Sequence, residues 1–150
     1  MNLKLNTQKR QAEIKFCDGH FICGNFFISP FSKGSPSGEN ALELLNDSRS
    51  YLPFEIAESE LSFLRKDLIM TVRMTVSEIP KELPYLRPVS AKIYLLSGDI
   101  FEGQVYIDLP KSHTRLSDFL NFSQQFIFIN IDEQDVLINT AFVKMVKSVL

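Results

Sequence analysis

The sequence predicts an all-β protein that consists of two tandem, five-stranded small barrels, each with a short helical turn. Three observations carry this prediction. The chain contains an internal repeat of about seventy residues, so one half should fold like the other. Each half holds several short segments of alternating apolar residues bounded by turn residues. The second of these segments has a glycine in its middle in both halves, which allows a strand to bend sharply.

The bulk composition is typical of a soluble folded chain without an overall positive charge. Of the 150 residues, 45% are hydrophobic and 23% are charged, and 13 phenylalanines supply apolar bulk for small cores. The net charge of −2 argues against a general attraction to nucleic acid or an anionic membrane. The opening MNLKLNTQKRQ has no apolar stretch typical of a signal peptide, and no apolar run exceeds four residues. Two cysteines in such a chain favour a reducing cytoplasm, with no membrane partner.

The internal repeat is clearest between 12–28 (AEIKFCDGHFICGNFFI) and 91–107 (AKIYLLSGDIFEGQVYI), which share five identities in 17 positions. Two further pairs of blocks follow in the same order: 44–56 with 119–131, and 63–72 with 137–146. Blocks in the same order indicate a duplication. We therefore expect a first repeat over 1–74, a proline-containing linker over 75–89 and a second repeat over 90–150.

The stretch FCDGHFICG (16–24) raises the question of a metal site, because two cysteines and a histidine recur at three-residue intervals. In the second copy, Leu96, Asp99 and Glu102 occupy the positions of Cys17, His20 and Cys23. A structural role survives such a change, whereas a shared zinc site does not. The sequence therefore predicts a turn here and no metal.

The geometry of a hairpin supports the same interpretation. The apolar residues on the two sides of the turn share one face only if the loop has an odd number of residues. A three-residue loop with a glycine in the left-handed conformation fits this condition. Gly19 supplies this glycine in the first copy and Gly98 in the second. In that register Cys23 faces Glu13, so neither a disulfide nor a chelate is presented.

The remaining elements follow in the same order in both copies. Gly24 and Gly103 fall inside the long second strands, at 20–28 and 99–107, where we expect a bend. A helical turn is expected in ALELLN (41–46) and in LSDFLN (116–121), with Asn40 and Thr114 as caps. Three more strands are expected in each copy: 50–56, 60–65 and 68–73, and then 125–131, 134–139 and 142–147.

Five short antiparallel strands with a bent second strand are typical of SH3-like small barrels. The pattern apolar-x-apolar-x-[Asp/Ser]-Gly-x4-Gly, which runs from Ile14 to Gly24 and from Ile93 to Gly103, resembles the first motif of Sm-like (LSm) proteins. The strand pairs at 63–72 and 137–146 occupy the place of the second Sm motif. The chain is also similar to bacterial proteins of unassigned function that share the Gly-x4-Gly hairpin and a leucine-rich turn.

The resemblance implies two properties beyond the fold. Sm-like proteins assemble into rings, in which the last strand of one barrel pairs with the fourth strand of the next. Sm proteins that bind RNA use an Asp-x-x-apolar-Asn loop that leads into the fourth strand, and an Arg-Gly or similar turn in the second motif. Residues at or near those positions here are the candidate nucleic-acid contacts, namely Asn46, Arg65, Lys66, Asn121 and Asn139.

The sequence contains no recognisable set of catalytic residues. His20 and His113 lie in different halves, and neither has a Ser or Cys nucleophile motif beside it. The segment KGSPSG (33–38) lacks the Lys-Ser/Thr of a phosphate loop. A set of acidic residues marks equivalent turns in both copies and is interpreted as solvated: Glu58, Glu60, Asp132, Glu133 and Asp135. The sequence thus predicts a non-catalytic binding or assembly module without a cofactor, and the alternative is an RNA-binding regulator.

The predicted partner is a second copy of the chain. The last strands of the two copies, 68–73 and 142–147, are apolar and contain no proline that would block strand pairing. Contacts of this head-to-tail kind must close into a ring or grow into a filament. We expect a homo-oligomer, foremost a ring-like trimer of tandems, with a dimer as the next possibility.

Overall fold

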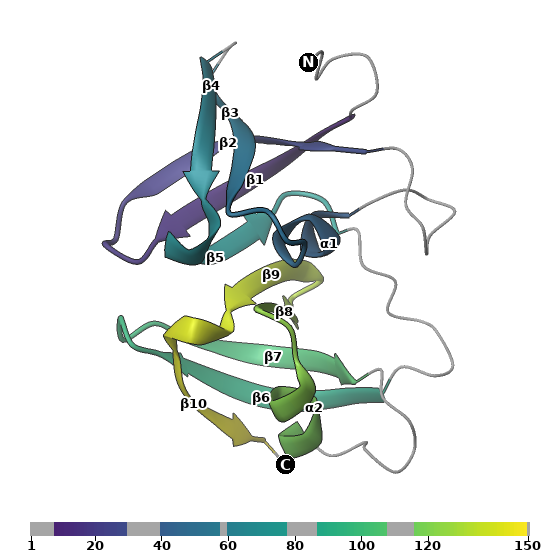
Figure 1. Ribbon diagram of the computed structural model, residues 1–150. Coiled ribbons are helices and arrows are strands. Elements are labelled where there is room, and N and C mark those ends of the chain that lie inside the picture. The colour runs from purple at the N-terminus through teal and green to yellow at the C-terminus, as the bar shows by residue number, and fades with distance from the viewer. Residues whose placement is uncertain (1–7, 30–39, 58–59, 78–86, 108–115, 150) are drawn as a thin grey trace.

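The computed structural model describes residues 8–29, 40–57, 60–77, 87–107 and 116–149. Ten strands form one antiparallel sheet in the order β10-β6-β7-β8-β9-β5-β1-β2-β3-β4, and the strand pairing does not close this sheet (Figure 1). The all-β prediction is therefore confirmed. The first half of the chain lies above the second in this view, with β5 of the upper half next to β9 of the lower half.

The two halves repeat the same sequence of elements, and each half has its first strand between its second and its fifth. The first half comprises β1 (Gln8–Phe16), β2 (Phe21–Ile28), α1 (Ala41–Leu45), β3 (Tyr51–Ile56), β4 (Glu60–Arg65), a 3₁₀ turn (Lys66–Leu68) and β5 (Ile69–Met74). The second comprises β6 (Arg87–Leu95), β7 (Ile100–Ile107), α2 (Leu116–Phe122), β8 (Phe126–Ile131), β9 (Gln134–Asn139), a 3₁₀ turn (Thr140–Phe142) and β10 (Val143–Ser148).

The first hairpin of each half has the register that the alternating apolar residues predict. Glu13 pairs with Cys23 in the first half, and Lys92 pairs with Glu102 in the second. Gly19 has φ 91° and Gly98 has φ 97°, the left-handed conformation that a three-residue hairpin loop requires. The alternating apolar residues, such as Ile14 and Phe26 in the first half and Ile93 and Val105 in the second, consequently face the interior.

Gly24 and Gly103 allow two strands to approach more closely than a side chain would permit. A Cβ atom on Gly24 would lie 2.0 Å from the carbonyl oxygen of Glu55, and one on Gly103 would lie 2.2 Å from that of Asn130. Both carbonyls belong to the third strand of their half, against which the second strand bends.

The short helix α1 begins where the sequence predicts. Asn40 is its N-cap, and the Asn40 side chain accepts a hydrogen bond from the backbone N–H of Glu43 at 2.9 Å. The predicted cap of α2, Thr114, lies outside the described residues. Both helices start within one residue of the predicted turns, because a cap followed by a leucine-rich turn is a strong local signal.

Two apolar clusters fill the interior, one for each half, and each extends across the boundary between the halves. The first cluster is built around Phe26 and Phe54, whose rings meet edge to face with centroids 5.0 Å apart. It also contains Phe126 and Leu137 of the second half. The second cluster contains Met70 of the first half. The halves thus share their cores.

The sequence predicts two tandem barrels, and the structure does not confirm them: the strand pairing joins all ten described strands into one open sheet through β5 and β9. β6 begins at Arg87 and includes Pro88, so it starts within the stretch predicted as a linker (75–89). Proline is tolerated there because Pro88 pairs with Tyr106 on one side, while β10 pairs with β6 only from Ala91 onward.

Candidate assembly interface

The inner joint is the pairing of β5 with β9, which connects the two halves of the chain. Three residue pairs form it: Thr71 with Ile138, Val72 with Leu137, and Arg73 with Val136. In this joint the fifth strand of one half adds to the fourth strand of the other. Every residue of β5 and β9 is buried except Arg73 and Gln134, which are intermediate.

An asparagine side chain fastens α1 to the second half. The amide of Asn46 donates a hydrogen bond to the carbonyl oxygen of Phe126 at 3.0 Å and accepts one from the N–H of Phe126 at 2.8 Å. Asn46 follows the last residue of α1, and Phe126 is the first residue of β8. The paired bonds resemble those of a strand partner, so we call this contact the asparagine clamp.

Further polar contacts surround the inner joint. Asn139 is fully buried and donates to the carbonyl oxygen of Ile69 at 2.9 Å. The guanidinium of Arg73 donates to the side chain of Gln134 at 2.9 Å. Lys15 forms an ion pair with Asp99 at 2.9 Å, which connects the first strand of one half to the hairpin of the other. The bond of Asn139 satisfies a polar group that the joint would otherwise bury unpaired.

A β-bulge directs one residue of β5 across the joint. The register between β1 and β5 shifts between Lys15, opposite Thr71, and Phe16, opposite Ile69, so Met70 has no partner on β1. Met70 belongs to the apolar cluster of the second half. The same shift occurs between β6 and β10, where Lys144 takes the position of Met70.

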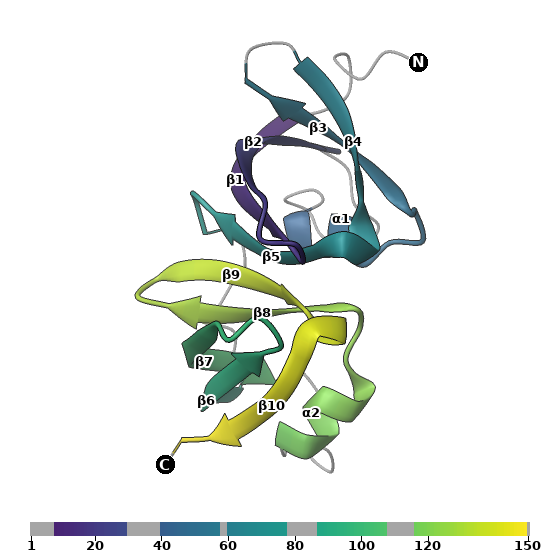
Figure 2. The ribbon, with the colours of Figure 1, turned by 90° about the vertical axis from the view of Figure 1, so that its left-hand side faces the viewer.

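The two outer edges of the sheet, β4 and β10, are the equivalents of the paired strands and have no strand on their outer sides within the described residues (Figure 2). They lie at opposite ends of the molecule. In β4 only Leu64 is buried, and in β10 no residue is buried. Phe63 is 63% exposed, whereas its equivalent in the inner joint, Leu137, is 1% exposed. Neither strand contains proline, and no strand in the described ranges covers either edge.

The same contrast appears at the start of the third strand of each half. Tyr51, the first residue of β3, is 56% exposed, and Phe126, the first residue of β8, is 1% exposed. Phe126 is buried because the first half covers it. Large apolar side chains at an unpaired edge are typical of a contact surface.

A hollow of about 290 Å³ lies beside β10 on the second half. It is lined by Leu120, Ile127, Thr140, Val143, Lys144, Met145 and Val146. Four of these, Leu120, Ile127, Val143 and Val146, have equivalents in the first half, Leu45, Leu52, Ile69 and Val72, that share a buried cluster with Phe126 and Leu137. The hollow is therefore the position on the second half that corresponds to an occupied one on the first.

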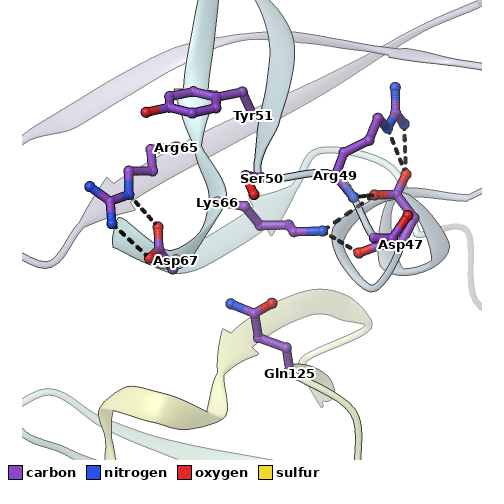
Figure 3. Close-up of a pocket in the computed structure, with 9 residues that line it drawn as sticks. Asp47, Arg49, Ser50, Tyr51, Arg65, Lys66, Asp67 and Gln125 are labelled. Atoms are coloured by element: carbon purple, nitrogen blue, oxygen red, sulfur yellow. Dashed lines mark hydrogen bonds and ion pairs between the residues drawn. The ribbon is translucent and has the colours of Figure 1, made fainter.

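The structure brings two of the five predicted nucleic-acid contacts together. Arg65 and Lys66 line a polar hollow of about 380 Å³ at the boundary of the halves, which Gln125 enters from the second half (Figure 3). Arg65 pairs with Asp67 at 2.8 Å on the surface, whereas the Lys66 side chain is buried and bonded to Asp47. The hollow also contains Arg49 and Tyr51.

The three predicted asparagines lie elsewhere and have other partners. Asn46 and Asn139 are engaged in the inner joint, as described above. Asn121 is exposed on α2, and its amide donates to the carbonyl oxygen of Ser117 at 2.7 Å. The five residues therefore do not form one continuous nucleic-acid surface.

Asp47 is the charged partner of both Arg49 and Lys66. Partial burial raises the pKa of Asp47, but hydrogen bonds from Arg49 and Lys66 and the charge of Arg49 outweigh it. The pKa of Asp47 consequently lies below its ordinary value. The carboxylate stays ionised and compensates the buried ammonium of Lys66, which makes this pair structural.

The other candidate residues show no cluster of chemistry. His20 is exposed and stacks on Phe16 with ring centroids 5.8 Å apart, and His113 lies outside the described residues. Cys17 and Cys23 are exposed, free thiols. Within the described ranges, no three His, Cys, Asp or Glu side chains lie together as a cation site. No helix in the described part of the chain is both long and apolar enough to cross a membrane.

The acidic turn residues have specific backbone or side-chain roles where they are described. Asp132 and Glu133 both have positive φ, 50° and 66°, and form the two-residue turn between β8 and β9. Asp135 is fully buried and accepts a hydrogen bond from Ser77 at 2.9 Å. Glu60 is exposed at the start of β4, and Glu58 lies outside the described residues.

Sequence reasoning missed the residues that distinguish the open edges from the joined ones. Tyr51 and Phe63 look like core residues in the sequence because they align with Phe126 and Leu137. A signal was present in the flanking positions, because β4 carries the polar and charged residues Glu60, Ser62 and Arg65 around its apolar ones.

Comparisons with models of protein families, with curated proteins and with solved structures give no match for this chain.

Proposed function

We propose that this protein is a non-catalytic assembly module, in which copies of the chain join head to tail through β10 of one copy and β4 of the next. Each half acts as an Sm-like, five-stranded barrel unit in this proposal. The observation that supports it is the inner joint: β5 already pairs with β9, and β10 and β4 are the equivalent strands. A surface that joins two halves within one chain can join two chains in the same way.

The inner joint defines the register of the joint between copies. Each residue of β10 and β4 takes the place of its equivalent in β5 and β9. The pairs between copies would therefore be Met145 with Leu64, Val146 with Phe63, and Lys147 with Ser62. Val146 and Phe63 then form an apolar pair, which stabilises an antiparallel ladder.

Charges at the ends of the two edges are complementary in this register. Lys147 occupies the position of Arg73, and Glu60 occupies that of Gln134, so the inner Arg–Gln hydrogen bond becomes a Lys–Glu ion pair between copies. Opposite charges at matched positions favour head-to-tail contact over contact between two identical edges.

The joint between copies is weaker than the inner joint. Lys144 stands at the bulge where Met70 projects into the neighbouring core, and a lysine there must keep its ammonium in water. Lysine on an edge strand also discourages unspecific pairing. The assembly is therefore reversible and depends on concentration.

Head-to-tail contacts need a closed ring to use every edge. Three chains would supply the six halves of a closed ring, so the expected assembly is a trimer. We expect this assembly to act in the cytoplasm.

The experiment that tests this proposal compares two charge insertions by sedimentation velocity. Phe63→Lys places a second positive charge on the β4 edge, opposite β10 with its own lysines, and should abolish association. Val76→Lys is the matched control: Val76 is 67% exposed and lies beyond β5, away from both open edges. If the Phe63→Lys chain associates as strongly as the Val76→Lys chain, the proposal is contradicted.

A second function, RNA binding, is supported by one observation. The polar hollow combines two arginines, Arg49 and Arg65, with the exposed ring of Tyr51, a combination that suits phosphate contact and base stacking. Binding of single-stranded RNA should then weaken steeply with salt, and Arg65→Ala together with Arg49→Ala should reduce both affinity and salt slope. Binding that is insensitive to salt would exclude this function for the hollow.

A further inference from the structure

The asparagine clamp of the inner joint has an unused counterpart in the second half. Asn121 stands 75 positions after Asn46, and Phe126 stands 75 positions after Tyr51. We infer that Asn121 is a clamp for a second copy of the chain, with its amide bonded to the backbone N–H and C=O of Tyr51 in that copy. This inference rests on the proposed head-to-tail assembly and adds the residue that fastens it.

The helices support this equivalence. Asn46 directly follows α1 (Ala41–Leu45), and Asn121 is the sixth residue of α2 (Leu116–Phe122), so each lies at the end of a short leucine-rich helix. In the first half, that position lies against the neighbouring half, where the clamp forms. In the second half, the same position is exposed.

The backbone of Tyr51 is oriented as the clamp requires. The N–H of Lys66 bonds the carbonyl oxygen of Ser50, as the N–H of Thr140 bonds that of Gln125. Because backbone groups alternate in direction along a strand, the N–H and C=O of Tyr51 point away from β4, as those of Phe126 point away from β9. Pairing of β2 with β3 includes only residues 54–56, so β2 does not reach Tyr51.

The hollow beside β10 has the right position to receive the side chains that accompany the clamp. In the first half, Phe126 and Leu137 share a buried cluster with Leu45, Leu52 and Ile69. The hollow is lined by their equivalents Leu120, Ile127 and Val143. Tyr51 and Phe63 of a second copy would occupy it, and both are exposed in the single chain.

Formation of the clamp requires one exchange of hydrogen bonds. In the single chain the amide of Asn121 donates to the carbonyl oxygen of Ser117, within α2. The clamp replaces this one bond by two bonds to a backbone edge, as Asn46 makes them. The exchange removes the Tyr51 backbone groups from water and satisfies them at the same time.

The first experiment is a dilution series of Asn121→Ala and the unchanged chain in sedimentation velocity. Loss of two hydrogen bonds should weaken association roughly tenfold. The thermal unfolding midpoint of the single chain should stay unchanged, because Asn121 is exposed there. Asn46→Ala is the paired control: it should lower the unfolding midpoint, because the same contact is internal to the fold.

The second experiment is a disulfide test in a chain with Cys17→Ser and Cys23→Ser. Variants with Asn121→Cys and with Tyr51→Cys are mixed under mild oxidation. The inference predicts a covalent dimer that contains one chain of each variant. The inference would be overturned if no covalent dimer forms, or if the covalent dimers contain only Asn121→Cys chains.

The outcomes separate the inference from the function on which it rests. If the unchanged chain does not associate, the head-to-tail assembly itself is wrong. If the chain associates but Asn121→Ala has no effect and the mixed disulfide does not form, the assembly stands and the clamp is overturned.

Discussion

Two glycines of the first half have different physical roles, although both were predicted from the repeat. Gly19 has φ 91° and open space around it, so its role is conformational. Gly24 has no such φ, but a Cβ atom there would collide with the backbone oxygen of Glu55 at 2.0 Å. The sequence already assigns Gly19 to a left-handed turn and Gly24 to a mid-strand bend, and the structure adds the backbone oxygen that Gly24 approaches.

This difference gives a prediction about stability. Gly19→Ala should cost about 1–2 kcal/mol, the usual cost of a left-handed non-glycine residue. Gly24→Ala should cost about 3 kcal/mol, because backbone must move and the β2–β3 pairing is disturbed. Urea unfolding at neutral pH measures both values. A larger loss for Gly19→Ala than for Gly24→Ala would contradict the assignment of roles.

Asp47 and Lys66 give a second residue-scale prediction, on pH. The pKa of Asp47 is lowered in the folded chain, so its contribution to stability is complete above the pKa of the unfolded chain and is lost as pH falls through the folded value. The loss should therefore occur below about pH 4. Asp47→Asn should cost about 1–2 kcal/mol at pH 7, discounted for partial exposure, because the buried Lys66 loses its counter-charge.

The control for this pair is the neighbouring surface pair. Asp67→Asn removes the partner of Arg65, which is exposed, and should leave stability almost unchanged. Equal losses for Asp47→Asn and Asp67→Asn in urea unfolding would show that burial of Lys66 has no role.

The hydrogen-bond partners of two asparagines could not be predicted from the sequence. The resemblance to Sm-like proteins suggested Asn46 and Asn139 as RNA contacts, and the structure gives both amides backbone partners in the inner joint. The sequence shows that an amide stands at a loop. It does not show which backbone the amide meets, because that partner comes from a strand about seventy to eighty residues away.

At the scale of elements, the strands were predicted to within one residue for most of the chain, because apolar alternation and turn residues are local signals. The exception is β6, which includes Pro88 and extends into the predicted linker. The connection of both halves into one sheet was not predicted, because β5 and β9 are equally apolar whether they pair with each other or with another chain.

The bulges in β5 and β10 give a prediction for a single element. Met70 projects from its bulge into the neighbouring core, and Lys144 takes the same place in β10. Lys144→Met should therefore strengthen association by about 1–2 kcal/mol, or roughly tenfold, because an apolar side chain replaces a charge in the joint. Dilution series in sedimentation velocity measure the change.

Lys92→Met serves as the control. Lys92 lies on β6, where it pairs with Lys147 of β10, so this substitution removes a positive charge at a position away from the bulge. Stronger association with Lys92→Met than with Lys144→Met would mean that net charge, and not the bulge, controls the joint.

At the scale of the whole molecule, the chain contains one completed joint and the two separate halves of another. β5 and β9 are covered by each other, while β4 and β10 at the two ends of the sheet expose the residues equivalent to those in the completed joint. Two complementary ends of this kind are the basis of the proposed head-to-tail assembly, because such contacts must close into a ring or grow into a filament.

The most direct test of this account is the mass of the unchanged chain in solution. Sedimentation equilibrium at micromolar concentration should give a multiple of the chain mass of 17.2 kDa, and three chains for the closed ring. The mass should fall toward that of one chain on dilution, because the joint between copies is weaker than the inner one. A constant mass of 17.2 kDa over the whole micromolar range would contradict the assembly.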